Sequence, residues 1–447
     1  MAIATTKGSP TFSRGIHPAD RKALAQDAAI EVVPAPARVA VPLLQHTGAP
    51  CQPLVTPRQA VAAGDRIGDH DSFICAPVHA PIAGVIEALS VTTLPNGRHV
   101  KTVPIAAAGE QLAGRALWDA LFGGDWAVRP NERDPAAIVA AVRDAGIVGL
   151  GGAAFPTHVK LTRNPVKPVD TLLVNGCECE PYLTADYRLM VEAPAAIVAG
   201  ARLAAHACGA ARIVIAIEDN KPAAATALAE AAGDSAAVVL VKTKYPMGGE
   251  RQLTPAVLKR AVPTGRLPLD VGVAVMNVGT AAAVAGAVLR GRPLTHRIVS
   301  VTGDGIASPK NLLVPIGISY RLLVDYCGGL SAGAARVLAG GPMMGFALAS
   351  LDVPVTKGAS GIVALTHNDI RDADQTACIR CGRCVDVCPL HLVPTKIALA
   401  SRHEDWDTAR RHHIAACCDC GCCSYICPAR IPLTQLIRMG KTQMMKK

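Results

Sequence analysis

Cysteines near the C-terminal end of the chain are the residues whose spacing points most clearly to chemistry. Of the 16 cysteines in 447 residues, ten lie between Cys378 and Cys427. Eight of them form two copies of C-x2-C-x2-C-x3-C, each followed by proline, which is the ligand pattern of bacterial ferredoxins with two [4Fe–4S] clusters. The eight are Cys378, Cys381, Cys384 and Cys388, then Cys417, Cys420, Cys423 and Cys427.

The fourth cysteine of each copy is expected to bind the other cluster, so the ligand sets are crossed. Cluster 1 would use Cys378, Cys381, Cys384 and Cys427, and cluster 2 would use Cys388, Cys417, Cys420 and Cys423. Cys418 and Cys422 are extra, and we expect them to be packing residues, because Gly421 stands where a frame starting at Cys418 would need its second ligand. A pair of structural zinc sites is the alternative, but zinc requires neither the third cysteine nor the repeated Cys-Pro. The pattern therefore favours one-electron transfer.

A glycine-rich loop, Gly149 to Pro156, is the second segment with chemical potential. It is similar to the dinucleotide fingerprint G-x-G-x-x-G/A, but a helix is expected before it instead of a strand, which disfavours an ordinary Rossmann site. Glycines let backbone N–H groups approach a phosphate closely, and Lys160 adds a positive charge nearby. A plain turn is the alternative.

The third segment, Asn175 to Tyr182, follows a run of buried-strand character, where ligand sites of α/β sheets gather. It carries Glu178 and Glu180, which form either part of an active-site edge or an exposed acidic turn. Cys177 and Cys179 are expected to be structural, because two cysteines without further close ligands are weak support for a third metal site.

The elements that would position these segments divide the chain into units. Residues 1–30 form an N-terminal extension, and 31–108 carry short β-rich runs broken by Gly and Pro, which predict a small β module. Within it the turn Ala76 to Pro81 bears His79 and no lysine, so a role as a carrier of a lysine-linked cofactor is disfavoured. Strands alternate with helices over 130–290, which predicts a parallel α/β sheet. Residues 291–365 predict an α+β unit, and 366–440 hold the clusters.

Composition limits the other readings. The longest uncharged stretch, Val271 to Leu289, contains Asn277 and three glycines and is expected to be a strand, a turn and a helix instead of a membrane span. The segment from Met1 to Arg21 lacks the apolar run of a signal peptide, so we expect reduced cysteines. The net charge of +10 comes without aromatic residues interleaved among basic ones, so no nucleic-acid partner is expected.

Taken together, these segments closely resemble the C subunit of the Rnf electron-transport complex over nearly the whole chain. The matching motifs are Gly149 to Lys160, Val174 to Thr184, Tyr245 to Leu253 and the twin cysteine runs, together with Gly15 to Pro18 and Gln45 to Pro50. The glycine-rich and Asn-x-x-Glu-x-Glu-Pro segments also look like the flavin- and NADH-binding subunit of respiratory complex I. Ala154 stands where many relatives have glycine.

The resemblance implies a fold of four parts: an N-terminal barrel-sandwich-like β module, a Rossmann-like α/β FMN domain, a β-grasp-like (SLBB) α+β domain and a C-terminal two-cluster ferredoxin domain. It implies FMN-binding residues, and it implies that Phe155 and Glu180 face the nicotinamide of NAD(H). The implied FMN-binding residues are Gly149, Gly151, Gly152, Lys160, Asn175, Glu178, Tyr245, Glu250, Asn277 and Thr280.

The resemblance further implies a peripheral subunit on the cytoplasmic side of a bacterial inner membrane. It would belong to a membrane-bound, ion-translocating NAD(H):ferredoxin oxidoreductase, an electron-transport translocase. Its partners would be membrane and iron–sulfur subunits of the Rnf complex, with ferredoxin or flavodoxin reached through the complex. Flavin chemistry needs no nucleophile or base triad, and none is evident. The alternatives are a soluble flavin and iron–sulfur corrin reductase, disfavoured by the β module that precedes the flavin segment, and a relay scaffold without catalysis.

Overall fold

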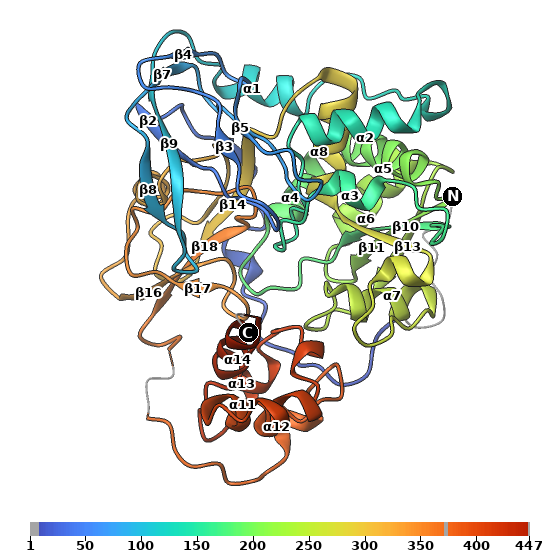
Figure 1. The fold of residues 1–447 in the computed structure, drawn as a ribbon, viewed down its shortest axis with the longest axis vertical. Coiled ribbons are helices and arrows are strands. Elements are labelled where there is room, and N and C mark those ends of the chain that lie inside the picture. Colours follow the sequence, from blue (N-terminus) through green and yellow to red (C-terminus); the bar gives the residue numbers. More distant parts are fainter. Residues whose placement is uncertain (1–8, 371–373, 446–447) are drawn as a thin grey trace.

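The computed structural model describes residues 9–370 and 374–445, so residues 1–8 of the expected extension lie outside the described residues. Figure 1 shows the chain as a β module drawn in blue, an α/β domain in green and yellow, a central sheet in orange and a helical C-terminal domain in red. The C-terminal domain lies at one end of the long axis, below both the α/β domain and the central sheet.

The β module consists of two small sheets around a common core. One sheet has the order β2-β9-β7-β4 with β8 paired to β9, and the other has the order β3-β5-β6. Val41, Ile67, Val78 and Ile105 are fully buried between them. The strands are β2 (Arg38–Pro42), β3 (Gln52–Pro53), β4 (Ala60–Val61), β5 (Arg66–Asp69), β6 (Val78–His79), β7 (Gly84–Ile86), β8 (Ser90–Thr93) and β9 (His99–Ala107).

The turn around His79 differs from its expected form as a hairpin tip. His79 lies in β6, is buried, and pairs with Arg66 of β5. Burial lowers the pKa of its imidazole to about 3, so the ring is neutral. A buried, neutral residue inside a sheet presents nothing to a partner, so His79 serves the core of the module.

The α/β domain is built on a four-stranded parallel sheet of order β12-β11-β10-β13. Its strands are β10 (Thr171–Gly176), β11 (Arg212–Glu218), β12 (Ala237–Val241) and β13 (Val273–Asn277). The helices are α2 (Pro135–Asp144), α3 (Thr157–Leu161), α4 (Ala185–Glu192), α5 (Pro194–Cys208), α6 (Pro222–Ala232), α7 (Glu250–Leu258) and α8 (Val278–Arg290), with the single turns η2 (Pro130–Glu132) and η3 (Pro268–Val271). Helix α1 (Gly114–Leu121) connects the β module to this domain.

Small residues set the packing of the α/β domain. A Cβ atom added at Gly200 of α5 would lie 1.7 Å from the carbonyl oxygen of Ala281 in α8. The two helix backbones therefore touch directly, which only glycine permits at the crossing point. This contact explains how a chain with 3% aromatic residues builds a close-packed core. The predicted N-cap also forms, because the Asp134 carboxylate accepts hydrogen bonds from the N–H groups of Ala136 and Ala137.

The central sheet has six strands in the order β1-β15-β14-β18-β16-β17. They are β1 (Ile30–Val32), β14 (His296–Thr302), β15 (Lys310–Pro315), β16 (Ala334–Ala339), β17 (Phe346–Ala347) and β18 (Gly361–Thr366), with helix α9 (Tyr320–Tyr326) against them. We expected the β module to begin at residue 31, whereas β1 pairs in parallel with β15. Pro34 and Pro36 separate β1 from β2, so the chain leaves one sheet before it enters the other.

The C-terminal domain is made of short helices around the cysteine loops. They are α10 (Arg383–Asp386), α11 (Pro394–Arg402), α12 (Trp406–Arg411), η4 (Ile414–Ala416), α13 (Cys422–Ile426) and α14 (Leu433–Met445). The fully buried Ile397, Ala398, Ala409 and Leu433 form its core. A turn near the N-terminus, η1 (Lys22–Leu24), completes the elements of the described residues.

Within 9–370 and 374–445, no single helix is long and apolar enough to cross a membrane. One pair of helices, α4 and α5, passes the length and composition test together, but it is bent by 94°. The uncharged stretch that starts at Val271 forms η3, β13 and α8, as the sequence predicts.

Candidate functional site

The site begins where two neighbouring strands of the parallel sheet end. β10 and β13 lie side by side with Asn175 opposite Asn277, and the other two strands continue on the far side of β10. The strand order reverses between β10 and β13, and in open α/β sheets ligands bind at this point, beyond the carboxyl ends of the strands. The two asparagines therefore mark the expected floor of a ligand site.

The glycine-rich loop lies directly over this floor. Its turn is closed by hydrogen bonds from Gly149 N–H to Phe155 O (2.8 Å) and from Ala154 N–H to Gly149 O (3.1 Å). Leu150 N–H donates to Thr280 Oγ1 (2.8 Å), which ties the loop to the first turn of α8. A Cβ atom at Gly151 would lie 3.4 Å from Cβ of Asn277, so the loop backbone passes close to the strand end.

The middle of this loop is open to a ligand. Gly151, Gly152 and Ala153 are exposed, and a Cβ atom at Gly152 would meet nothing within 4 Å. Ala154 adopts the left-handed conformation with φ 48°, which glycine adopts without strain. An exposed loop backbone next to the N-terminus of the 13-residue helix α8 offers N–H groups and a positive dipole end to an anion.

The two asparagines at the strand ends are occupied by the protein's own groups. Oδ1 of Asn277 accepts hydrogen bonds from Gly279 N–H (2.8 Å) and Thr280 N–H (3.3 Å), and its Nδ2 donates to Asp186 Oδ2 (2.6 Å). Nδ2 of Asn175 donates to Gly248 O (2.8 Å), and its Oδ1 accepts from Cys177 N–H (3.0 Å). Both side chains fix the loops that surround the floor of the site.

The two glutamates of the Asn175–Tyr182 segment are used in the same way. The Glu178 carboxylate accepts hydrogen bonds from Asp186 N–H (2.8 Å) and Tyr187 N–H (3.2 Å) at the start of α4. The Glu180 carboxylate accepts from Met343 N–H (3.0 Å) and Met344 N–H (2.8 Å) in the central sheet domain. Burial raises the pKa of each carboxyl group to about 7. The alternative of an exposed acidic turn is wrong.

Lys160, Glu250 and Phe155 surround the loop with part of each side chain exposed. Lys160 lies in α3, and its Nζ is 3.4 Å from Val275 O on β13. Glu250 is the first residue of α7, and Phe155 closes the glycine-rich turn through its carbonyl oxygen. Lys160 is therefore placed beside the strand that ends at Asn277, where it can contribute a positive charge.

Arg297 is a site residue that sequence reasoning missed. It lies on β14 of the central sheet, is buried, and donates from Nη2 to Leu150 O (3.2 Å) in the glycine-rich loop. Burial lowers the pKa of its guanidinium to about 10, and the nearby Asp186 opposes that fall. An arginine inside a predicted strand carries no motif, so no sequence signal could have assigned it to a loop 147 residues away.

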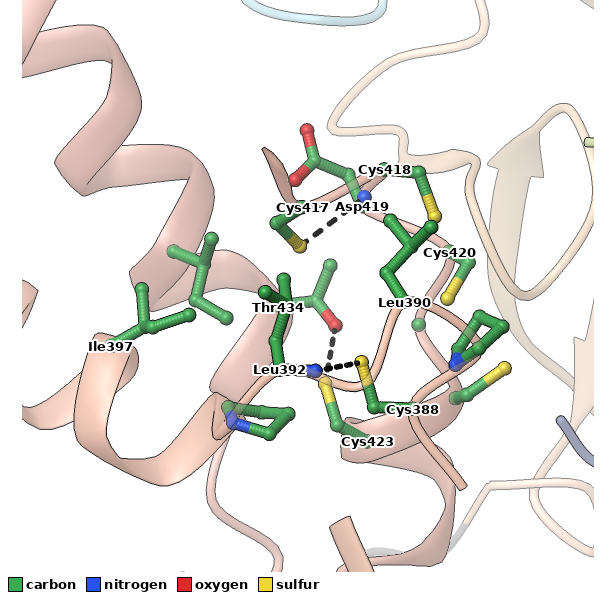
Figure 2. Close-up of a pocket in the computed structure, with 15 residues that line it drawn as sticks. Cys388, Leu390, Leu392, Ile397, Cys417, Cys418, Asp419, Cys420, Cys423 and Thr434 are labelled. Carbon is green, nitrogen blue, oxygen red and sulfur yellow. Dashed lines mark hydrogen bonds between the residues drawn. The ribbon is translucent and has the colours of Figure 1, made fainter. Parts of the chain in front are cut away.

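In the C-terminal domain, the four cysteines predicted for cluster 2 line one pocket. Cys388, Cys417, Cys420 and Cys423 surround it together with apolar side chains that include Leu390 and Ile437. Figure 2 shows two of the hydrogen bonds that reach their sulfur atoms, from Leu392 N–H to Cys388 Sγ (3.4 Å) and from Asp419 N–H to Cys417 Sγ (3.4 Å). Cysteine sulfurs with N–H donors in an apolar pocket fit an iron–sulfur cluster.

The remaining cysteines of this domain fall into two groups. Cys384 lies near Cys427, and burial raises the pKa of the Cys384 thiol, to which the charge of Cys427 adds. Cys378 is half-buried and Cys381 is exposed. The extra residues Cys418 and Cys422 line the same pocket as the four predicted ligands of cluster 2, so their packing role remains a prediction.

Tyr245 connects the two halves of the site instead of lining the glycine-rich loop. Its side chain is buried, and its hydroxyl donates to the backbone oxygen of Cys420 (2.7 Å). Three residues further along, Gly248 receives the hydrogen bond from Asn175 and donates from its N–H to Cys179 Sγ (3.4 Å). A short segment thus joins the end of β10 to the cysteine pocket.

The N-terminal segment strengthens the same junction. Ile16 pairs with Tyr245, and Gly15 N–H donates to Val387 O (3.1 Å) beside Cys388. Nη1 of Arg14 donates to Val385 O (2.7 Å). The Gly15–Pro18 motif therefore holds the C-terminal domain against the α/β domain.

Four family models match the chain in the order of its structural units. They are the RnfC barrel sandwich hybrid domain over residues 10–110, the Nuo51 FMN-binding domain over 142–286, the SLBB domain over 298–347 and the 4Fe-4S binding domain over 373–391. The predicted fold class is confirmed. Fold and site together define a flavin and iron–sulfur oxidoreductase subunit.

The relatives are similar along almost the entire chain, and each is the C subunit of an ion-translocating complex. The sequence is 42% identical to that of the Na+-translocating ferredoxin:NAD+ oxidoreductase complex of Acetobacterium woodii, covering 97% of both chains. It is 39% identical to that of the proton-translocating ferredoxin:NAD+ oxidoreductase complex of Clostridium ljungdahlii, covering 90% of this chain and 87% of that one. It is 41% identical to that of the ion-translocating oxidoreductase complex of Rhodobacter capsulatus, covering 96% and 82%. The chain belongs to the RnfC family.

Proposed function

We propose that this chain exchanges a hydride with NAD(H) and delivers single electrons to partner subunits of an ion-translocating ferredoxin:NAD+ oxidoreductase complex. The observation that carries the proposal is the junction of the two sites. The segment Tyr245–Gly248 is bonded at one end to Cys420 of the cysteine pocket and at the other to Asn175 at the strand switch point. A two-electron site and a one-electron site are thus held together by one short piece of chain.

The residues around the glycine-rich loop fit FMN. FMN, when bound, supplies the change from two-electron to one-electron transfer. The exposed backbone of Gly149, Gly151 and Gly152, the N-terminus of α8 and Lys160 would hold its phosphate. Asn175, Glu178, Asn277 and Thr280 would hold the walls of the site in place through the hydrogen bonds described above. Glu250 and Tyr245 are also proposed as FMN-binding residues, with Phe155 and Glu180 on the nicotinamide side.

Two [4Fe–4S] clusters would supply one-electron transfer in the C-terminal domain. We propose Cys378, Cys381, Cys384 and Cys427 as ligands of the first. For the second, the ligands are Cys388, Cys417, Cys420 and Cys423, which line a common pocket. The hydrogen bond from Tyr245 to the backbone of Cys420 favours the second cluster as the one nearer to the α/β domain.

We propose that the chain acts at the cytoplasmic face of the inner membrane as a peripheral subunit, because NAD(H) and ferredoxin are cytoplasmic electron carriers. The names of the relatives describe Na+-translocating and proton-translocating complexes. Ion movement would belong to the partner subunits, and ferredoxin or flavodoxin would exchange electrons through the complex. We also propose the domain limits 31–108, 130–290, 291–365 and 366–440, with β1 reassigned to the central sheet.

The test is an absorbance spectrum of the anaerobically purified chain with iron and flavin analysis, followed by addition of NADH. We expect about eight irons and one FMN per chain, and bleaching of the flavin and cluster bands by NADH. Iron without flavin would leave only a relay. A protein without iron or flavin would refute the assignment of both sites.

A further inference from the structure

Three potential metal ligands from separate loops meet inside the β module, away from the cysteine runs. A ring nitrogen of His46 and the sulfur atoms of Cys51 and Cys75 all lie within 4.8 Å of one another. His46 and Cys51 precede β3, and Cys75 precedes β6. All three side chains are buried, with exposed fractions of 7%, 2% and 0%. The functions assigned above use none of them.

The spacing of the two sulfur atoms suits a shared ion. Cys51 Sγ and Cys75 Sγ are 3.6 Å apart, far beyond a disulfide bond of about 2.05 Å. Two sulfur ligands of one tetrahedral zinc ion lie about 3.8 Å apart, because each Zn–S bond is about 2.3 Å. The pair therefore already has the separation that zinc requires.

The histidine ring is oriented as in a metal site. Nε2 of His46 lies 2.9 Å from Ala49 O and 3.3 Å from the N–H of Ala76. Nδ1 is buried and has no hydrogen-bond partner among the described residues. Metal-binding histidines donate one ring N–H to a backbone carbonyl and use the other nitrogen as ligand. Donation from Nε2 to Ala49 O leaves the lone pair of Nδ1 free for an ion.

The surrounding charges favour thiolates. Lys357 is buried nearby and donates from Nζ to Gly146 O (2.7 Å). The pKa of Cys75 falls to about 5, chiefly because the Cys51 thiol donates to it, with His46 also contributing. The pKa of Cys51 rises for the same reason, since its proton is held between the two sulfurs. Binding of a dication would release that proton and neutralise both thiolates.

We propose that His46, Cys51 and Cys75 bind one Zn2+ ion in the β module. The ion would have two thiolates and one imidazole nitrogen as protein ligands, with a solvent molecule in the fourth position. Its charge balances the two thiolates. The site does not depend on flavin, iron or any activity of the protein.

The position of the site suggests what the ion stabilises. Thr47, next to His46, donates from its N–H to Ala154 O (3.2 Å) and from Oγ1 to Ala153 O (3.2 Å) in the glycine-rich loop. Phe73, two residues before Cys75, has its carbonyl oxygen 2.9 Å from Nε2 of His158 in α3. The zinc would hold together the loops of the β module that contact the glycine-rich loop and the helix after it.

The test measures zinc and iron together in the full-length protein, purified anaerobically with its iron–sulfur clusters. We expect about one zinc per chain in the wild type and at least about tenfold less in a variant carrying Cys51→Ala and Cys75→Ala, with iron unchanged. The control Cys327→Ala removes a buried cysteine from the central sheet domain and should keep both metals. Equal zinc in wild type and double variant would overturn the proposal.

A second measurement covers the case in which the double variant does not fold. Wild-type protein whose zinc has been exchanged for Co2+ should show thiolate-to-cobalt charge-transfer absorption, and His46→Ala should change its d–d bands. Wild-type protein without zinc, or one with a Cys51–Cys75 disulfide under anaerobic conditions, contradicts the site. Because zinc is counted separately from iron, flavin and NADH oxidation, failure here is distinguishable from failure of the proposed function.

Discussion

Replacing Tyr245 by phenylalanine should loosen the junction between the α/β domain and the cysteine pocket. The substitution removes one hydroxyl and leaves the ring, so packing is retained while the 2.7 Å hydrogen bond to Cys420 O is lost. The carbonyl oxygen of a buried residue then has lost its donor, which costs about 1–3 kcal/mol. A loss of about one to two kcal/mol corresponds to a factor of about 5–30 in a local opening equilibrium.

Hydrogen exchange of the peptide around Cys417–Cys423 in the anaerobic protein measures this opening. We expect exchange there to be faster by about 5–30-fold, with peptides of the β module unchanged. Tyr320→Phe is the matched control, because Tyr320 is equally buried but lies in the central sheet domain. Equal exchange of the Cys417–Cys423 peptide in both variants would refute the role of Tyr245. In the loaded protein, reduction of the clusters by NADH should slow while reduction of the flavin does not.

Three further predictions test packing, protonation and cluster ligation. Gly200→Ala should destabilise the fold by about 1–3 kcal/mol or more through its clash with the carbonyl of Ala281, as measured by urea unfolding, whereas Gly286→Ala, with 4.0 Å of clearance, should not. Glu180 keeps a proton in the folded protein between its ordinary pKa of 4.5 and about 7, so stability falls as the pH rises through this range. Glu180→Gln should reduce that fall by up to about 3 kcal/mol in urea unfolding at pH 5 and 8. With crossed ligand sets, the double variant Cys388→Ala and Cys417→Ala should lose about half of the iron, whereas Cys384→Ala and Cys388→Ala together should lose nearly all of it.

Each of these predictions has a contrary outcome. Equal stability of the two glycine variants would mean that α5 and α8 do not touch at Gly200. Parallel pH profiles for wild type and Glu180→Gln would mean that Glu180 is ionised across the range. Uncrossed clusters would reverse the two iron results, because each double variant would then remove ligands from the other combination of clusters.

The sequence predicted the regular elements of the α/β domain well because local signals there agree with tertiary packing. The helix Pro222–Ala232 and the strand Ala237–Val241 form with the expected limits, and α2 begins after the expected N-cap, Asp134. Proline at the first helical position and a buried β-branched run are determined by neighbouring residues. The cysteine runs were equally clear, because their spacing is dictated by the ligand geometry of the cluster.

Sequence reasoning failed where a residue acts across domains. Arg297 and β1 reach their partners through contacts between segments that are far apart in the chain, and neither carries a local signature. His79 looked like part of an exposed turn because Pro77 and Pro81 flank it, yet its side chain fills the core of the β module. Turn residues report the path of the backbone and do not show which face of the turn is covered.

The hydrogen bonds at the site indicate a division of labour among the residues that the family resemblance assigns to FMN. Asn277 and Glu178 have their hydrogen-bonding groups committed to the backbone of α8 and α4, and Thr280 Oγ1 receives the N–H of Leu150. These side chains set the shape of the site, while the exposed backbone of the glycine-rich loop and Lys160 remain to meet the phosphate. Changes at Asn277 should therefore weaken flavin binding and loosen α8 together, whereas Lys160→Ala should weaken binding with little effect on stability.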